Sequence, residues 1–217
     1  MNPPDNIIQQ AAITKFPSPL KETSMTGEEK KEAIATHVRA IMEILGLDLE
    51  HHSLKQTPER VARMYVDEIF SGLDPSTFPR ISLFEESHGE FKQGNMIVTR
   101  VDIVSFCEHH LVPMIGSAHI GYIPQKTVLG LSKISRIARY FAARPQLQER
   151  LTAQIGDSLA TILGHDDVIV QVRAQHMCVV ARGTKDQNGL TTTLHCSGLF
   201  ESSHDLRKEF IELIRNT

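Results

Sequence analysis

Several kinds of residue and segment are scarce in this sequence, and each scarcity narrows what the protein can be. The 217 residues include three cysteines and no tryptophan. An odd and sparse set of cysteines is not a disulfide framework, and it suits a reducing compartment. No uncharged apolar run approaches the roughly 20 residues of a membrane-spanning helix. The N-terminal stretch MNPPDNIIQQ lacks the basic and apolar regions of a signal peptide.

Charge of one sign is not in large excess either. The formal net charge is −3, which argues against a general nucleic-acid coat or a membrane-surface protein, although a local basic pocket stays compatible with it. We therefore expect a cytoplasmic protein with no nucleic-acid partner and no membrane partner.

The residues that are present suit an ordinary globular protein. Hydrophobic residues make up 41% of the chain and charged residues 23%, which is enough for a normal core. The first 25 residues contain four prolines and no sustained apolar period, so we expect a disordered arm there. A capping box at Thr26 and Glu29 predicts a first helix that Gly46 can end. A second helix is expected from Thr57 to Gly72.

Paired strand patterns follow, separated by helical patterns. Strands are expected over 80–86 and 95–106, around the polar turn 87–89, and over 114–123, 168–182 and 190–200; helices are expected over 131–144, 145–164 and 203–215. Strands in consecutive pairs favour an antiparallel sheet with helices on one face, which is an α+β fold. The expected divisions are a disordered arm (1–25), a helical region (26–78) and one domain (79–217).

Candidate metal ligands gather in the stretch FCEHHLVP. Cys107 and His110 have C-x-x-H spacing, which lets both side chains converge from one tight turn. In the expected strand VIVQVRAQHMCVVAR, His176 and Cys178 are two residues apart and should face the same side. The rest of that side is apolar, so a histidine and a cysteine at its end need a partner. Cys107, His110 and Cys178 form a candidate Cys₂His set, with His109 and His176 beside it.

Three interpretations of this set stay open. Three protein ligands with an open position are typical of catalytic zinc, whereas a structural zinc normally has four ligands. His195 or Cys196 could supply the fourth ligand of a structural site. Without a metal, the cysteines could be small buried apolar residues. The flanking histidines favour the catalytic interpretation, because such a site needs proton carriers near neutral pH.

A candidate anion site lies at the start of the helix expected over 131–144. Ser132, Lys133 and Arg136 occupy its first turns, where free backbone N–H groups and the positive end of the helix dipole favour anions. Ser132 and Arg136 are four residues apart and share a face. With Arg182, this pattern indicates a phosphate site. The alternative is a solvated basic helix face.

Gln148 and Glu149 lie in the first turn of the next expected helix. A carboxylate at this position is favourable for the helix dipole alone. As a binding group, Glu149 could accept two parallel N–H bonds, which guanine offers through N1–H and its 2-amino group and adenine does not. A buried acceptor built for that pair can reject the wrong base by about 10⁴-fold.

Four motifs in fixed order, CEHHLVP, GLSKISR, RPQLQERLT and HMCVVARG, resemble GTP cyclohydrolase I of the zinc-dependent type. The resemblance runs from about Thr57 to the C-terminus. It implies a hydrolase that opens the imidazole ring of GTP, releases C8 as formate and rearranges the ribose to 7,8-dihydroneopterin triphosphate, the entry step to folate and other pterins. It also implies the tunnelling fold, a four-stranded antiparallel sheet with two helices on one side, and a toroidal homodecamer with active sites between subunits.

The resemblance also implies roles for particular residues. One zinc ion per subunit would be held by Cys107, His110 and Cys178. Whether His109 or His176 protonates the purine ring stays open. The catalytic residues so implied are His109, His176 and Ser132; the substrate contacts are Glu149, Gln148, Lys133, Arg136, Arg182, Arg60 from a neighbouring subunit, and Glu108.

The sequence departs from the family pattern in two places. Gly116 and Ser117 stand where many members have Gly-Lys, and Gly189 replaces a common serine. His195 and Cys196 replace small polar residues in the last expected strand; we expect them to pack, but near the zinc they would close its open position. A catalytically silent GTP-binding paralogue is therefore the alternative function, and another tunnelling-fold enzyme is a further rival.

Overall fold

A computed structural model describes residues 5–12, 14–85 and 95–215 of the chain. Its centre is a five-stranded sheet in the order β5-β2-β3-β6-β7. Four of the strands pair antiparallel, and the two-residue strand β5 joins β2 in parallel. The strands are β2 (Ile97–Cys107), β3 (Pro113–Tyr122), β5 (Pro145–Gln146), β6 (Val168–His176) and β7 (Thr191–Cys196). The predicted antiparallel set of four strands is thereby confirmed.

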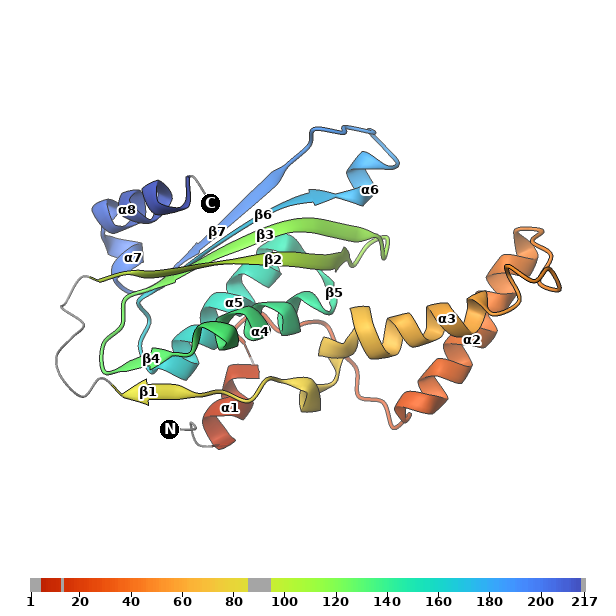
Figure 1. Ribbon diagram of the computed structural model, residues 1–217, viewed down its shortest axis with the longest axis horizontal. Helices are drawn as coiled ribbons and strands as arrows, with labels where there is room; N and C mark the ends of the chain where they lie inside the picture. Colours follow the sequence, from red (N-terminus) through yellow and green to blue (C-terminus); the bar gives the residue numbers. More distant parts are fainter. Residues whose placement is uncertain (1–4, 13, 86–94, 216–217) are drawn as a thin grey trace.

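Two amphipathic helices cover one face of this sheet. Helices α4 (Leu131–Ala142) and α5 (Gln148–Leu163) lie on one side of the strands, and α7 (Leu199–Ser202) and α8 (His204–Ile214) lie on the other (Figure 1). The main core lies between α4, α5 and the sheet, and a smaller cluster around Phe200 and Phe210 lies under α7 and α8. The order of elements predicted from the apolar periods is confirmed, because each period buries its apolar side against a neighbouring layer.

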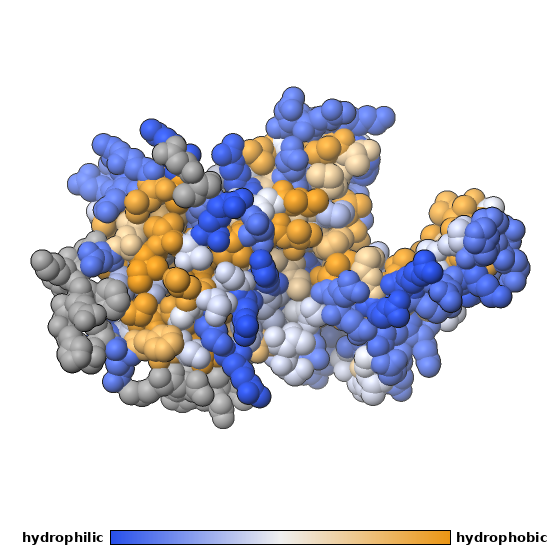
Figure 2. All heavy atoms as spheres, in the orientation of Figure 1, coloured by the Kyte–Doolittle hydropathy of each residue, from blue (hydrophilic) through white to orange (hydrophobic). Residues whose placement is uncertain are grey.

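The N-terminal helices project away from the sheet (Figure 1). Helix α2 (Gly27–Ile44) begins with the predicted capping box, in which Thr26 and Glu29 exchange hydrogen bonds. Helix α3 (Thr57–Arg63) continues as a π-helix, η1 (Met64–Ile69), and then as the 3₁₀ turns η2 (Ser71–Leu73) and η3 (Pro75–Thr77). Apolar side chains show at the tip of this projection (Figure 2), where Ile44 is 84% and Leu45 70% exposed.

The segment before α2 differs from the predicted disordered arm. It contains a helix, α1 (Asp5–Ala12), whose Ala11 is fully buried in the main core. The backbone that follows is held by α5, since Gln154 Nε2 donates to Phe16 O at 2.7 Å and Lys15 N donates to an Asp157 carboxylate oxygen at 3.2 Å. A helix of eight residues is stable only through tertiary packing, so its short apolar pattern was not enough to predict it.

Two strand predictions need correction. The strand β1 (Leu83–Glu85) pairs with β4 (Thr127–Leu129) rather than with β2, so residues 80–86 and 95–106 do not form a hairpin. The predicted turn 87–89 lies outside the described residues. The strand expected over 168–182 ends at His176, and a helical turn, α6 (Met177–Val180), follows it. None of the helices in the described ranges combines the length and apolar character needed to cross a bilayer.

Candidate metal centre and substrate site

Three potential metal ligands meet at one end of the sheet. Cys107 ends β2, His110 lies in the turn that follows, and Cys178 lies in α6. Their ligand atoms all lie within 4.8 Å of one another. The Cys107 carbonyl accepts hydrogen bonds from the backbone N–H groups of His110 and Leu111, at 3.3 and 2.8 Å, which closes a tight turn. Two thiols and an imidazole are donors that suit zinc, so this cluster could bind a metal ion.

The route by which Cys178 reaches the cluster differs from the prediction. Strand alternation would have put His176 and Cys178 on one face, but the chain turns into α6 at Met177. Cys178 then packs against Cys107, Met114 and Ala174. Burial, with the contact to Cys107, raises the pKa of the Cys178 thiol. A metal ion would reverse that effect, because a coordinating thiol gives up its proton.

Two further histidines flank the cluster. The Nδ1 atom of His109 lies 3.8 Å from Cys107 Sγ, and the His109 side chain is exposed. His176 is half-buried at the end of β6, with Nε2 2.8 Å from Gln148 Oε1. Burial lowers the pKa of His176, and the nearby Glu149 carboxylate partly opposes that shift. The structure therefore places the His109 ring next to Cys107, and it bonds the His176 ring, two residues before Cys178, to Gln148.

The sequence predicted that Gln148 contacts the substrate, but the structure buries its side chain. Its side chain is only 2% exposed, and its Nε2 donates to the carbonyls of Val172 and Thr191 and to Thr193 Oγ1. All its polar atoms therefore have partners within the chain. Glu149, the next residue, is exposed in the first turn of α5 and is free to meet a ligand.

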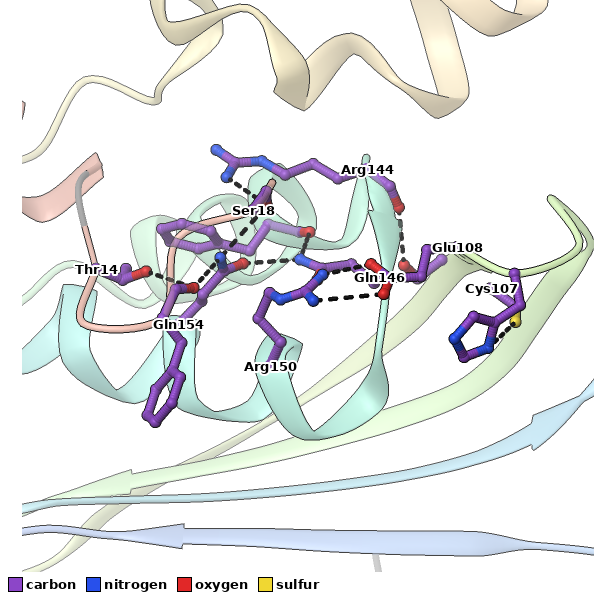
Figure 3. Close-up of polar contacts among 12 residues, drawn as sticks. Thr14, Ser18, Cys107, Glu108, Arg144, Gln146, Arg150 and Gln154 are labelled. Atoms are coloured by element: carbon purple, nitrogen blue, oxygen red, sulfur yellow. Dashed lines mark hydrogen bonds and ion pairs between the residues drawn. The ribbon is translucent and has the colours of Figure 1, made fainter. Parts of the chain in front are cut away.

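Glu108 forms an ion pair that the sequence analysis missed. Arg150 Nη1 lies 2.5 Å from Glu108 Oε2 and Arg150 Nη2 lies 3.4 Å from Oε1, so the guanidinium donates a hydrogen bond to each carboxylate oxygen (Figure 3). The exposed fractions of the two side chains are 16% and 22%. The pair ties the turn that carries His109 and His110 to the first turn of α5. No local spacing links residues 42 positions apart, so the sequence held no signal for it.

A pocket of about 330 Å³ adjoins this ion pair. Its lining residues are Glu108, His109, Pro145, Leu73 and the N-terminal residues Ser18, Pro19 and Leu20. The Ser18 hydroxyl accepts hydrogen bonds from Arg144 Nη1 and Gln154 Nε2, both at 3.4 Å, which hold this residue in place (Figure 3). The N-terminal segment is therefore one wall of a hollow beside His109.

Arg182 also lies at the cluster, whereas the other predicted phosphate contacts do not. Arg182 Nη1 lies 2.7 Å from His110 Nε2. The C-terminal end of α4 leads into β5, where Gln146 pairs with Cys107. The 12 residues of α4 span about 18 Å, so its first turn, with Ser132 and Lys133, starts about 18 Å from the end of the helix that approaches the cluster. Arg136 lies in the second turn. Arg60 is exposed on α3, and its guanidinium donates to Gln56 Oε1.

His195 and Cys196 lie far from the cluster as well. In the sheet register His195 stands opposite Val170 and Cys196 opposite Ile169, whereas the cluster end of β6 is His176. Six residues of extended strand separate Val170 from His176, which is about 20 Å. Neither residue can be a fourth ligand within the same chain, and the metal cluster found in the described ranges has no fourth member.

Comparison with known proteins agrees with these features. The model of the family described as GTP cyclohydrolase I matches residues 34–215. The chain belongs to the GTP cyclohydrolase I family. It is 50% identical over 195 residues to GTP cyclohydrolase 1 of Aeromonas salmonicida (strain A449), covering 89% of this chain and 88% of that protein. It is 45% identical over 211 residues to GTP cyclohydrolase 1 of Aliivibrio salmonicida (strain LFI1238), covering 96% of each. GTP cyclohydrolase I family membership thus extends over the helical projection and the whole sheet.

Proposed function

We propose that this protein is a GTP cyclohydrolase I. It opens the imidazole ring of GTP at C8 by hydrolysis of cyclic amidine C–N bonds, releases formate and rearranges the ribose to 7,8-dihydroneopterin triphosphate. The observation that carries this proposal is the convergence of Cys107, His110 and Cys178, with His109 and His176 beside them, in a chain of this family. The reaction is the first step of folate and pterin biosynthesis, and we place it in the cytoplasm.

The metal in this proposal is zinc, one per subunit. Cys107, His110 and Cys178 would hold it, because their donor atoms are close together and of the types that zinc prefers. When bound, zinc supplies a Lewis acid that activates water near neutral pH. His109 and His176 move protons to and from the purine and ribose atoms that react. Arg182 beside the cluster neutralises negative charge on the substrate.

Recognition of the base falls to Glu149. Its carboxylate is exposed at the start of α5, one residue beyond Gln148, which is bonded to His176. A carboxylate there can accept the parallel N1–H and 2-amino hydrogens of guanine, and adenine offers no such pair. Glu108 is already paired with Arg150, so we assign it to holding the turn rather than to binding GTP.

The triphosphate contacts come from a second copy of the chain in this proposal. Ser132, Lys133 and Arg136 lie in the first two turns of α4, away from the end of that helix that approaches the metal cluster, and Arg60 lies on the helical projection. A neighbouring subunit can bring these residues to the cluster, as in the toroidal homodecamer that the family resemblance implies. The apolar tip at Ile44 and Leu45 supplies a surface suited to such contacts.

We also assign the domain over 79–217 to the tunnelling fold, because of the order in which its four antiparallel strands pair.

The test is to incubate the purified protein with GTP and quantify formate, and a fluorescent pterin after oxidation. Formate and pterin from GTP but not from ATP, abolished by a chelator, are expected. Cys178→Ser should remove both metal and activity. Cys196→Ser is the matched control, because Cys196 lies at the other end of the sheet. GTP binding without formate would favour the silent paralogue, which the distance of His195 and Cys196 from the cluster argues against.

A further inference from the structure

The buried side-chain amide of Gln148 is hydrogen-bonded to the imidazole of His176. We infer that Gln148 is a positioning residue that keeps a hydrogen on Nε2 of His176 and fixes the orientation of the ring, with Nδ1 as its open nitrogen. This inference rests on the proposed function and deepens it. It replaces the expected contact between Gln148 and the substrate with a role that acts through His176.

The orientation of the Gln148 amide follows from its partners. One end lies 3.0 Å from Val172 O and 3.1 Å from Thr191 O. Both are backbone carbonyls, which only accept hydrogen bonds. That end of the amide must therefore be the NH₂ group, and the end that faces His176 must be the carbonyl oxygen Oε1.

The hydroxyl groups of Thr152 and Thr193 give the same orientation of the Gln148 amide independently. Thr152 Oγ1 donates to the backbone carbonyl of Gln148 at 2.7 Å. Since its hydrogen is used there, the 2.6 Å contact between the Thr152 and Thr193 hydroxyls has Thr193 as donor. Thr193 Oγ1 then accepts from Gln148 Nε2 at 3.1 Å. If the amide were reversed, its oxygen would face Thr193 Oγ1 and both carbonyl oxygens, and none of these three atoms has a free hydrogen to donate to it.

The tautomer of His176 follows from the amide orientation. Gln148 Oε1 can only accept, and it lies 2.8 Å from His176 Nε2, so Nε2 carries a hydrogen. In a neutral imidazole the other nitrogen is then an unprotonated acceptor. No hydrogen bond to His176 Nδ1 is found among the described residues. The geometry is the same when the ring is protonated, because Nε2–H still donates to Oε1 and only Nδ1 gains a hydrogen.

Solid-state ¹⁵N NMR of the metal-loaded protein with labelled histidine tests this directly, whatever the size of the assembly. The His176 signals are those lost in His176→Gln. At a pH well above the ordinary histidine pKa of about 6.5, we expect a protonated Nε2 and an unprotonated Nδ1. A protonated Nδ1 in the wild-type protein would overturn the inference, and this result needs no variant of Gln148 to fold.

Steady-state kinetics of Gln148 variants test whether this hydrogen bond matters for activity. Gln148→Met keeps the shape of the side chain and removes its hydrogen bonds, so kcat should fall about 10- to 100-fold, the range for loss of an orienting partner, with little change in KM for GTP. In folded Gln148→Met the His176 signals should no longer show a single form protonated at Nε2, because no acceptor holds that hydrogen. Gln175→Met is the matched control, since Gln175 bonds only to Gln187 O and adjoins His176 on the other face of β6.

Unchanged kcat in folded Gln148→Met would overturn the positioning role. His176 signals in folded Gln148→Met that match those of the wild-type protein would also overturn it, because a purely structural role leaves the position of the ring hydrogen unchanged. If the wild-type protein releases no formate from GTP, the proposed function fails, and the NMR result still decides the position of the hydrogen. The two failures are therefore distinguishable.

Discussion

Replacing Arg150 by methionine tests how firmly the metal-binding turn is held. The Glu108–Arg150 pair is about four-fifths buried, with both carboxylate oxygens near the guanidinium. Removing one partner of a fully buried pair costs about 3–5 kcal/mol because a lone charge is left behind. Exposed pairs contribute about 0–1 kcal/mol. For a pair of intermediate burial we expect Arg150→Met to lower the free energy of unfolding by about 2–3 kcal/mol, between these limits.

The control is a second Arg–carboxylate pair, which lies on β2. Arg100 Nη2 lies 2.9 Å from Asp102 Oδ1, but the two side chains are 50% and 71% exposed. Arg100→Met should therefore cost less than about 0.5 kcal/mol. Because both pairs are of the same chemical type, the difference between the two variants isolates the effect of burial.

The assay is urea unfolding at one fixed protein and zinc concentration, since assembly and metal binding both add to apparent stability. The double variant with Glu108→Gln completes a mutant cycle, and the coupling energy should be about 1–2 kcal/mol for partners in direct contact. A loss in Arg150→Met no larger than that in Arg100→Met would refute the reasoning. Arg150→Met should also bind zinc more weakly, because its loss frees the turn between Cys107 and His110.

Three further outcomes are expected. Cys178→Ser should bind zinc at least tenfold more weakly by competition with a chelator, because a thiolate ligand is lost; unchanged affinity would remove Cys178 from the site. Burial lowers the pKa of His195 below its usual 6.5, so the unfolded chain binds more protons below that pH and the free energy of unfolding falls on acidification. In His195→Phe the free energy of unfolding, measured with urea, should fall less between about pH 6.5 and 5 than in the wild type. The same pH dependence in both proteins would contradict this. A Cβ at Gly116 would lie 1.9 Å from Arg173 O. Gly116→Ala should therefore destabilise the fold by about 1–3 kcal/mol through overpacking and lower the melting temperature by several degrees. A melting temperature equal to that of the wild type would be inconsistent with this close approach.

Local signals in the sequence predicted most elements of the fold. The Thr26–Glu29 capping box appears where the residues predicted it, and α2 ends just before Gly46, which has a positive φ. These features depend on hydrogen bonds and backbone angles within a few residues. The prediction for α1 was different from the structure, because a short helix is decided by its packing on α5 rather than by its own periodicity.

The candidate metal site was only partly accessible to sequence reasoning. The C-x-x-H spacing placed Cys107 and His110 on one turn, since a turn of that length has few conformations. The argument that put Cys178 beside His176 on one face of a strand was wrong, because α6 interrupts the alternation. The grouping itself is nevertheless found, because the helical turn brings Cys178 back to Cys107.

The sequence alone determined the order of elements, the identity of the metal-ligand candidates and the family resemblance, since these depend on residue types and short spacings. Only the tertiary structure decided how distant residues meet. It paired Gln148 with His176 and Glu108 with Arg150, and it set the start of α4 about 18 Å from the end of that helix that approaches the metal cluster. Strand register and helix packing set those distances, and they arise from the summed contacts of the whole core rather than from any local pattern.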